Sequence, residues 1–304
     1  MREVINLLPI YYFGCFFCSA LGVFSNQKYA RSGKKINNIH IYSLVSGLIA
    51  MAFFYVSSGF NININFRTLI YSVIFALLIF ANYFLVLIVF RHMGIAEKTF
   101  ICSGLSLIFT MIMGVVLFNE VPSEKTAVQL VLVLATLFVI FLPTLKKKDA
   151  KKMVTAIGVV LCLGITVLGV GCTLVAKYFA EDLKAGTVTD ENSFFFLTNV
   201  FIVVFGICTV MISQKGSVKA VVKEFKSVSP FNYFMIVLNV VSSNMHSLLQ
   251  MLIFKEGDLI LYAPLNGALG LLAGEVVAVV FAKEKPRILA TILALSSVLV
   301  VLLF

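Results

Sequence analysis

The sequence predicts an all-α polytopic membrane protein with ten transmembrane helices, and three observations lead to this fold class. Of its 304 residues, 61% are hydrophobic and only 12% are charged, whereas soluble domains carry about 25% charged residues. The mean hydropathy is +1.04. Ten apolar stretches are each long enough to cross a bilayer, which takes about 20 residues. This composition excludes a soluble enzyme, a disordered chain and a nucleic-acid-binding protein, and it makes the lipid bilayer the expected surroundings.

Each apolar stretch is expected to be a helix, because only helices and closed barrels satisfy backbone polar groups in lipid. Barrel strands alternate apolar and polar residues, and these stretches do not. The first five stretches cover about 8–25, 39–58, 68–90, 99–118 and 126–143. The next five cover about 153–176, 194–213, 230–254, 259–282 and 288–304. We therefore expect a first five-helix repeat at 1–145, a basic linker at 146–152 and a second five-helix repeat at 153–304.

The two halves of the chain resemble each other at equivalent places. Glu120 and Pro122 end the fourth stretch, and Glu284 and Pro286 end the ninth stretch with the same spacing. Because each half has an odd number of spans, the second half would insert upside down relative to the first. Such inverted repeats are common in secondary transporters, which place the substrate site near the middle of the membrane at the repeat interface.

These features resemble the drug/metabolite transporter superfamily, and in particular its EamA-type carriers. The resemblance rests on the five-plus-five spans, the two Glu-x-Pro pairs and the basic linker, and it covers essentially the whole chain. It implies that the first four helices of each half surround a central cavity, while the fifth and tenth pack at the periphery or at a homodimer contact. It gives Glu120 and Glu284 a structural role at helix ends. It implies no particular substrate.

The distribution of Lys and Arg predicts an orientation in the cell (plasma) membrane. Of the 24 basic residues, 18 lie in the loops that follow odd-numbered spans and six lie on the other side. Basic residues concentrate in cytoplasmic loops, so this count places both termini outside the cytoplasm. The family resemblance implies both termini inside. We favour the charge distribution, because a threefold asymmetry is large.

Polar residues inside spans are costly and need a role. Four of them fall on one face of the eighth span, because successive helical residues are about 100° apart: Asn239, Ser243, His246 and Gln250. We expect these four to bind substrate, with hydrogen bonding between helices as the alternative. Asn82 precedes His246 by the same offset that separates the two Glu-x-Pro pairs. It is therefore expected to face His246 across the pseudo-two-fold axis and to bind substrate as well.

The fourth and ninth spans supply further candidates. Three hydroxyl side chains share one face of the fourth span: Ser103, Ser106 and Thr110. Ser106 is the candidate substrate contact among them. The equivalent positions in the second half are all glycine: Gly267, Gly270 and Gly274. Small residues at this spacing permit close helix packing. Pro264 and Asn266 are expected to loosen the start of the ninth span.

Two titratable residues within spans are candidates for coupling transport to protons, namely His246 and Glu275. The alternative for Glu275 is to reach the membrane interface or to pair with Lys283. No metal or other cofactor is expected, since the three histidines are isolated and the six cysteines lie in apolar runs. Enzyme activity is not expected either, because no nucleophile–base pair is recognisable.

The function expected from the sequence is therefore secondary transport of a small organic metabolite by alternating access, with proton coupling as an option. Few fixed charges lie inside the spans, which favours a neutral or zwitterionic solute. The alternative is a non-transporting or lipid-translocating membrane subunit with the same fold.

Overall fold

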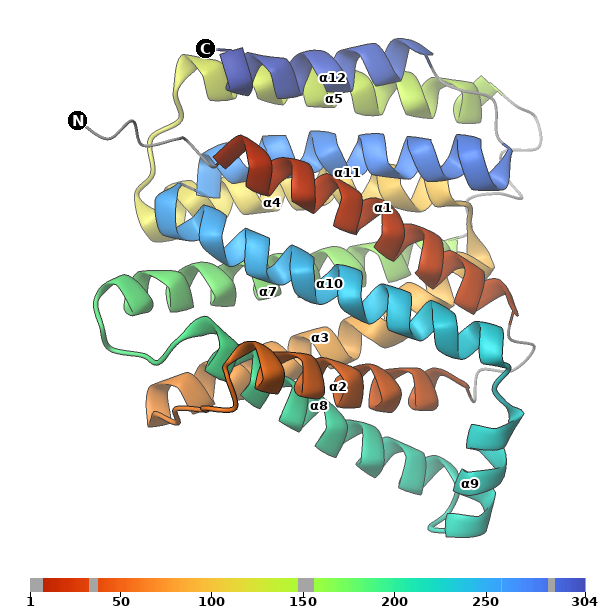
Figure 1. Cartoon of the computed structure of the whole chain (residues 1–304). Helices are drawn as coiled ribbons and strands as arrows, with labels where there is room; N and C mark the ends of the chain where they lie inside the picture. The colour runs from red at the N-terminus through yellow and green to blue at the C-terminus, as the bar shows by residue number, and fades with distance from the viewer. Residues whose placement is uncertain (1–7, 33–37, 147–155, 258, 284–287, 304) are drawn as a thin grey trace.

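The computed structural model describes residues 8–32, 38–146, 156–257, 259–283 and 288–303. Within these residues the protein has eleven α-helices and no β-strand (Figure 1). The helices of the first half are α1 (Leu8–Ser32), α2 (Asn38–Ser57), α3 (Phe66–His92), α4 (Ile95–Phe118) and α5 (Glu124–Lys146). Those of the second half are α7 (Ala156–Lys184), α8 (Glu191–Ser213), α9 (Val218–Ser227), α10 (Pro230–Glu256), α11 (Leu259–Ala282) and α12 (Ile288–Leu303).

Six of these helices contain a segment long and apolar enough to cross a membrane, namely α3, α4, α7, α8, α10 and α11. Shorter apolar segments cover Ile41–Ser57 in α2, Thr126–Val139 in α5 and Thr291–Val300 in α12. The chain is thus all-helical in its described part and has the composition of a membrane protein.

Every predicted span corresponds to one observed helix, with bounds that differ mainly at the ends. α1 runs on to Ser32 and α7 to Lys184, because hydropathy marks only the apolar part of a helix that continues into polar residues. Helix α9 is not among the predicted spans. Residues 147–152 of the predicted linker, together with Glu284 and Pro286, lie outside the described residues.

Helix ends follow local sequence signals. Asn65 precedes α3 and accepts a hydrogen bond from the backbone N–H of Arg67 at 2.8 Å, and Asp190 does the same for Ser193 before α8 at 2.9 Å. Such side chains satisfy N–H groups that have no partner within the helix. After α4 and α11 the chain turns through left-handed residues, Asn119 (φ 52°) and Lys283 (φ 55°). Each of these two residues directly precedes the glutamate of a Glu-x-Pro pair, so the turns occupy equivalent places in the two halves.

The helices of the two halves pack against one another in a regular pattern. α1 packs on α10 and α3 on α7, while α2 packs on α8, α4 on α11 and α5 on α12. Exchanging each helix for the one at the same place in the other half, with α9 left out, returns this same set of pairs. In Figure 1, α5 and α12 lie at one edge of the bundle and α2 and α8 at the other. The remaining six long helices lie between these two outer pairs.

Glycines allow close approach at two of these contacts. A Cβ atom on Gly206 would lie 3.0 Å from the Cα of Leu44, where α8 meets α2. A Cβ atom on Gly274 would lie 3.0 Å from Thr99, where α11 meets α4. Close backbone approach strengthens van der Waals contact, which matters in lipid because apolar burial drives helix association weakly there.

A buried carboxylate fastens the end of α4 to the start of α11. Glu120 accepts hydrogen bonds from the backbone N–H groups of Leu259 at 2.9 Å and Ile260 at 2.7 Å. The Lys177 ammonium of α7 lies 3.6 Å from the same carboxylate and donates to the carbonyl of Gly257 at 3.0 Å. A negative group is stabilised at a helix N-terminus, where unpaired N–H groups and the helix dipole are positive.

Along the chain, Glu120 lies between the end of α4 and the start of α5. The structure instead places its carboxylate at the start of α11, in the other half. The left-handed turn at Asn119 allows the Glu120 N–H to bond the carbonyl of Gly114 at 3.2 Å. A Cβ atom on Gly114 would lie 2.9 Å from the Glu120 carboxylate, so the glycine provides the space for it.

The Glu120→Gln variant is expected to lower the free energy of unfolding by about 3 kcal/mol or more, because it removes the buried counter-charge of the Lys177 ammonium and leaves only an exposed one. The affinity for a solute should change less. Thermal unfolding of the purified protein in detergent measures the loss. The matched control is Glu181→Gln, whose carboxylate lies 3.8 Å from the same ammonium but is 44% exposed. Exposed pairs contribute about 0–1 kcal/mol, so the Glu181→Gln variant should lose little stability. Equal melting temperatures for the two variants would contradict the role of Glu120.

Candidate functional site

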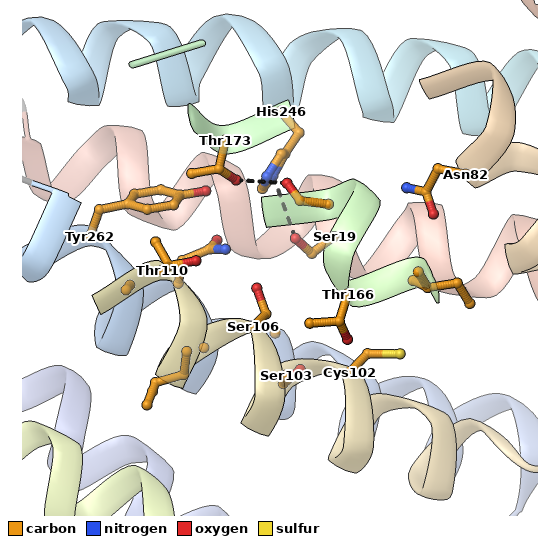
Figure 2. Close-up of a pocket in the computed structure, with 17 residues that line it drawn as sticks. Ser19, Asn82, Cys102, Ser103, Ser106, Thr110, Thr166, Thr173, His246 and Tyr262 are labelled. Atoms are coloured by element: carbon orange, nitrogen blue, oxygen red, sulfur yellow. Dashed lines mark hydrogen bonds between the residues drawn. The ribbon is translucent and has the colours of Figure 1, made fainter. Parts of the chain in front are cut away.

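A cavity of about 220 Å³ lies between the two outer helix pairs. Its lining comes from six helices: α1, α3, α4, α7, α10 and α11. The volume is below the roughly 300–1,000 Å³ of pockets for drug-sized ligands, so the space suits a smaller molecule. Figure 2 shows polar side chains from several of these helices gathered around the space.

The cavity lining is polar but carries no fixed charge. Ten of its residues have polar side chains: Ser19, Asn82, Ser103, Ser106, Thr110, Thr166, Thr173, His246, Tyr262 and Asn266. None of the lining residues is Asp, Glu, Lys or Arg. In the described part of the chain, no group of three or more His, Cys, Asp or Glu side chains is arranged to hold a metal ion. Hydroxyl and amide groups can donate and accept hydrogen bonds, so the site is suited to an uncharged polar molecule.

The hydroxyl face of α4 and the glycine face of α11 meet at this cavity. All three hydroxyls predicted to share a face, those of Ser103, Ser106 and Thr110, line it, and so do Gly267 and Gly270. A Cβ atom on Gly270 would lie 3.7 Å from the Ser103 hydroxyl. The glycines therefore bring the two helices together and also leave space beside the hydroxyls.

The four polar residues predicted to share a face of α10 do not all reach the cavity. His246 lines it, whereas Asn239, Ser243 and Gln250 do not. Asn239 is buried and accepts a hydrogen bond from Ser25 of α1 at 3.4 Å. Of the four residues of this helix that are predicted to bind substrate, only His246 lines the cavity.

Polar pairs repeat along the contact between α1 and α10. From one end to the other they are Ser32 with Asn232 at 2.5 Å, Ser25 with Asn239 at 3.4 Å, and Ser19 with His246 at 3.5 Å. Successive pairs are about two helical turns apart, so they form a line between two antiparallel helices. Much of the polar stripe on α10 therefore forms hydrogen bonds between helices, and only its centre opens onto the cavity.

Asn82 and His246 both line the cavity, from α3 and α10. The side-chain oxygen of Asn82 is buried and has no hydrogen-bond partner among the described residues. A buried carbonyl oxygen without a partner is costly, so this atom is suited to accept a hydrogen bond from a bound molecule. Figure 2 shows the His246 ring directed toward Ser19, with Ser106 across the space from it.

Of the two candidates for proton coupling, only one lines the cavity. His246 lines the cavity, while Glu275 of α11 is half-buried and is not among the lining residues. A proton on Glu275 would therefore not contact a solute in this cavity directly.

Several lining residues are not predicted by the sequence. Thr166 and Thr173 of α7 donate hydrogen bonds to carbonyls one turn earlier, those of Cys162 at 2.8 Å and Gly169 at 3.1 Å. Threonines make such bonds in many helices, so nothing in the sequence marks these two as site residues. Asn266 does have a signal, because it follows Pro264, which cannot donate a backbone hydrogen bond within α11.

The fold of this chain is similar to that of a solved structure, but its sequence matches no known family. No protein-family model matches the sequence, and no curated protein matches it. A solved structure described only as "Crystal structure of protein" aligns with 97% of this chain and 96% of its own, with a TM-score of 0.67 and 13% sequence identity. The chain is therefore similar in fold to a known structure along nearly its whole length.

Proposed function

We propose that this protein is a secondary transporter that moves a small, uncharged organic metabolite across the cell membrane by alternating access. The observation that carries the proposal is the central cavity, which is lined by hydroxyl, amide and imidazole groups and by no fixed charge. Desolvating a charged solute in such a site would be costly, because no opposite charge compensates it.

The fold is interpreted as ten membrane-spanning helices in two inverted repeats, with α9 as an addition. The exchange-symmetric packing of the helices supports this interpretation. So do the left-handed turns at Asn119 and Lys283, which occupy equivalent places in the two halves. The same features support a relationship to EamA-type carriers of the drug/metabolite transporter superfamily. Alternating access at the interface of inverted repeats is an established transport mechanism.

The charge of the solute can be tested with a metabolite library and the purified protein. We expect uncharged polar compounds to raise the melting temperature, since a ligand that binds the folded state stabilises it. Derivatives of the best compound that carry a carboxylate or an ammonium should give smaller shifts. A set of stabilising compounds dominated by charged molecules would contradict the proposal.

Transport is tested separately, by counterflow of the best compound in proteoliposomes. Exchange of labelled solute supports a carrier. Binding without exchange, or movement of lipid headgroups alone, would favour the non-transporting or lipid-translocating alternative.

Contact of the solute with Asn82 and His246 can be tested by cysteine labelling. Cys102 lines the cavity and Cys208 is exposed, so the test uses a background in which all six native cysteines are replaced by Ser. In that background Asn82→Cys and His246→Cys should react with a water-soluble thiol reagent, and the best stabilising compound should slow the reaction. Ser243→Cys is the matched control, because it lies on α10 outside the cavity lining. Reaction at position 243 alone, in variants that still transport, would show that Asn82 and His246 are inaccessible.

Proton coupling is expected to depend on His246. An imidazole ordinarily titrates near neutral pH, and this one lines the cavity. His246→Gln should abolish pH-driven accumulation of solute in proteoliposomes while solute exchange continues. Glu275→Gln is the control from outside the cavity lining, and it should retain accumulation. Accumulation by the His246→Gln variant would mean that this residue does not carry the coupling proton.

The end of the bundle with the excess of Lys and Arg is proposed to face the cytoplasm. α1 begins and α12 ends at the opposite end (Figure 1), so both termini would be outside. A C-terminal reporter that is active only in the cytoplasm should give no signal. Strong activity would reverse this orientation.

A further inference from the structure

One helix has no equivalent in the first half of the chain. Helix α9 connects α8 to α10, whereas the corresponding connection between α2 and α3, residues 58–65, contains no helix. The chain leaves α8 through two left-handed residues, Lys215 (φ 50°) and Gly216 (φ 75°). This turn redirects the chain, and Figure 1 shows α9 running across the end of the bundle rather than along the long helices. A helix in this position would lie parallel to the membrane surface.

Specific hydrogen bonds hold α9 in this position. At its start, the Ser217 hydroxyl accepts a hydrogen bond from the backbone N–H of Ala220 at 3.3 Å. At its end, the carbonyl of Phe225 accepts a hydrogen bond from the Tyr233 hydroxyl of α10 at 2.8 Å. The helix also contacts the ends of α2 and α8. It is therefore a positioned part of the fold.

The sequence of α9 separates apolar from basic residues around the helix. Three large apolar residues fall on one face, at helical spacing: Val221, Val222 and Phe225. Its three lysines, Lys219, Lys223 and Lys226, fall on the adjacent face and are exposed. Val222 is also 47% exposed. The helix thus presents an apolar edge beside a row of ammonium groups.

The three lysines of α9 differ in their partners from three basic side chains at the opposite end of the bundle. At the end opposite α9, Arg67 pairs with Asp182, Lys177 with Glu120, and Lys255 with Glu191. The three lysines of α9 form no ion pair within the part of the chain that the structure describes. They are therefore placed to bind an anion from outside the chain.

We propose that α9 is a binding site for anionic phospholipids. Its apolar edge enters the boundary of the acyl chains, and Lys219, Lys223 and Lys226 bind the headgroup phosphates of the adjacent leaflet. Amphipathic helices with basic faces bind membranes in this way, at a depth of about 5–10 Å. Each lysine near an anionic surface adds to the attraction. This proposal does not depend on the transport function.

The test uses the full-length protein in micelles that contain equal amounts of phosphatidylglycerol and phosphatidylcholine. Native mass spectrometry then measures how much of each lipid stays bound. The wild-type protein should retain phosphatidylglycerol preferentially. The triple variant K219Q/K223Q/K226Q should lose that preference by about tenfold or more, as expected if three lysines each contribute. The matched variant K219R/K223R/K226R keeps the charge and should keep the preference.

Two further measurements test whether the lipid binds at α9, and whether it binds through both its phosphate and its acyl chains. Lys184→Gln removes a lysine at the opposite end of the bundle, and the preference for phosphatidylglycerol should be unchanged. Inorganic phosphate at millimolar concentration should compete only weakly with the lipid for binding, because it has no acyl chain to contact the apolar edge at Val222. The proposal is overturned if the Gln triple variant retains the lipid preference, if Lys184→Gln loses it equally, or if free phosphate displaces the lipid fully.

Discussion

The carboxylate of Glu120 is the contact on which the arrangement around the cavity depends. It bonds the first N–H groups of α11 and lies beside the Lys177 ammonium of α7. Three of the helices that line the cavity, α4, α7 and α11, are therefore fixed to one another at one end of the bundle. The charges are almost fully buried, with side chains 8% and 5% exposed, so solvent screens their interaction little.

Away from this corner, the helices associate through small residues and hydrogen bonds. Lipid removes most of the hydrophobic gain from packing one apolar helix on another. Glycines such as Gly206 therefore bring backbones together, and polar pairs between α1 and α10 add directional contacts. The line of pairs reaches the cavity at Ser19 and His246. A substrate that bonded either group would thus act directly on a contact between two helices.

Charged and uncharged polar groups occupy different parts of the molecule and have different roles. Ion pairs and capped helix ends hold the bundle together where the helices end. Hydroxyl groups in the middle, such as those of Ser106 and Thr110, can rotate to donate or accept. That adaptability would suit the proposed transport function, in which a site binds its solute and then releases it. The basic helix α9 adds a third element, positioned for the lipid surface rather than for the cavity.

Sequence alone predicts ten of the eleven helices in the described part of the chain, because an apolar stretch of spanning length must form a helix to satisfy its backbone hydrogen bonds in lipid. It does not predict α9, which is too short and too basic to be a span. It also identifies Asn82, Ser106 and His246, which line the cavity, through polarity inside spans. It cannot separate His246 from Asn239, since helical periodicity gives the shared face but not which neighbour that face meets. Nor can it place Glu120 on α11, 139 residues away in sequence from Leu259. Those two outcomes depend on how helices distant in the chain pack, and only the tertiary structure decides that.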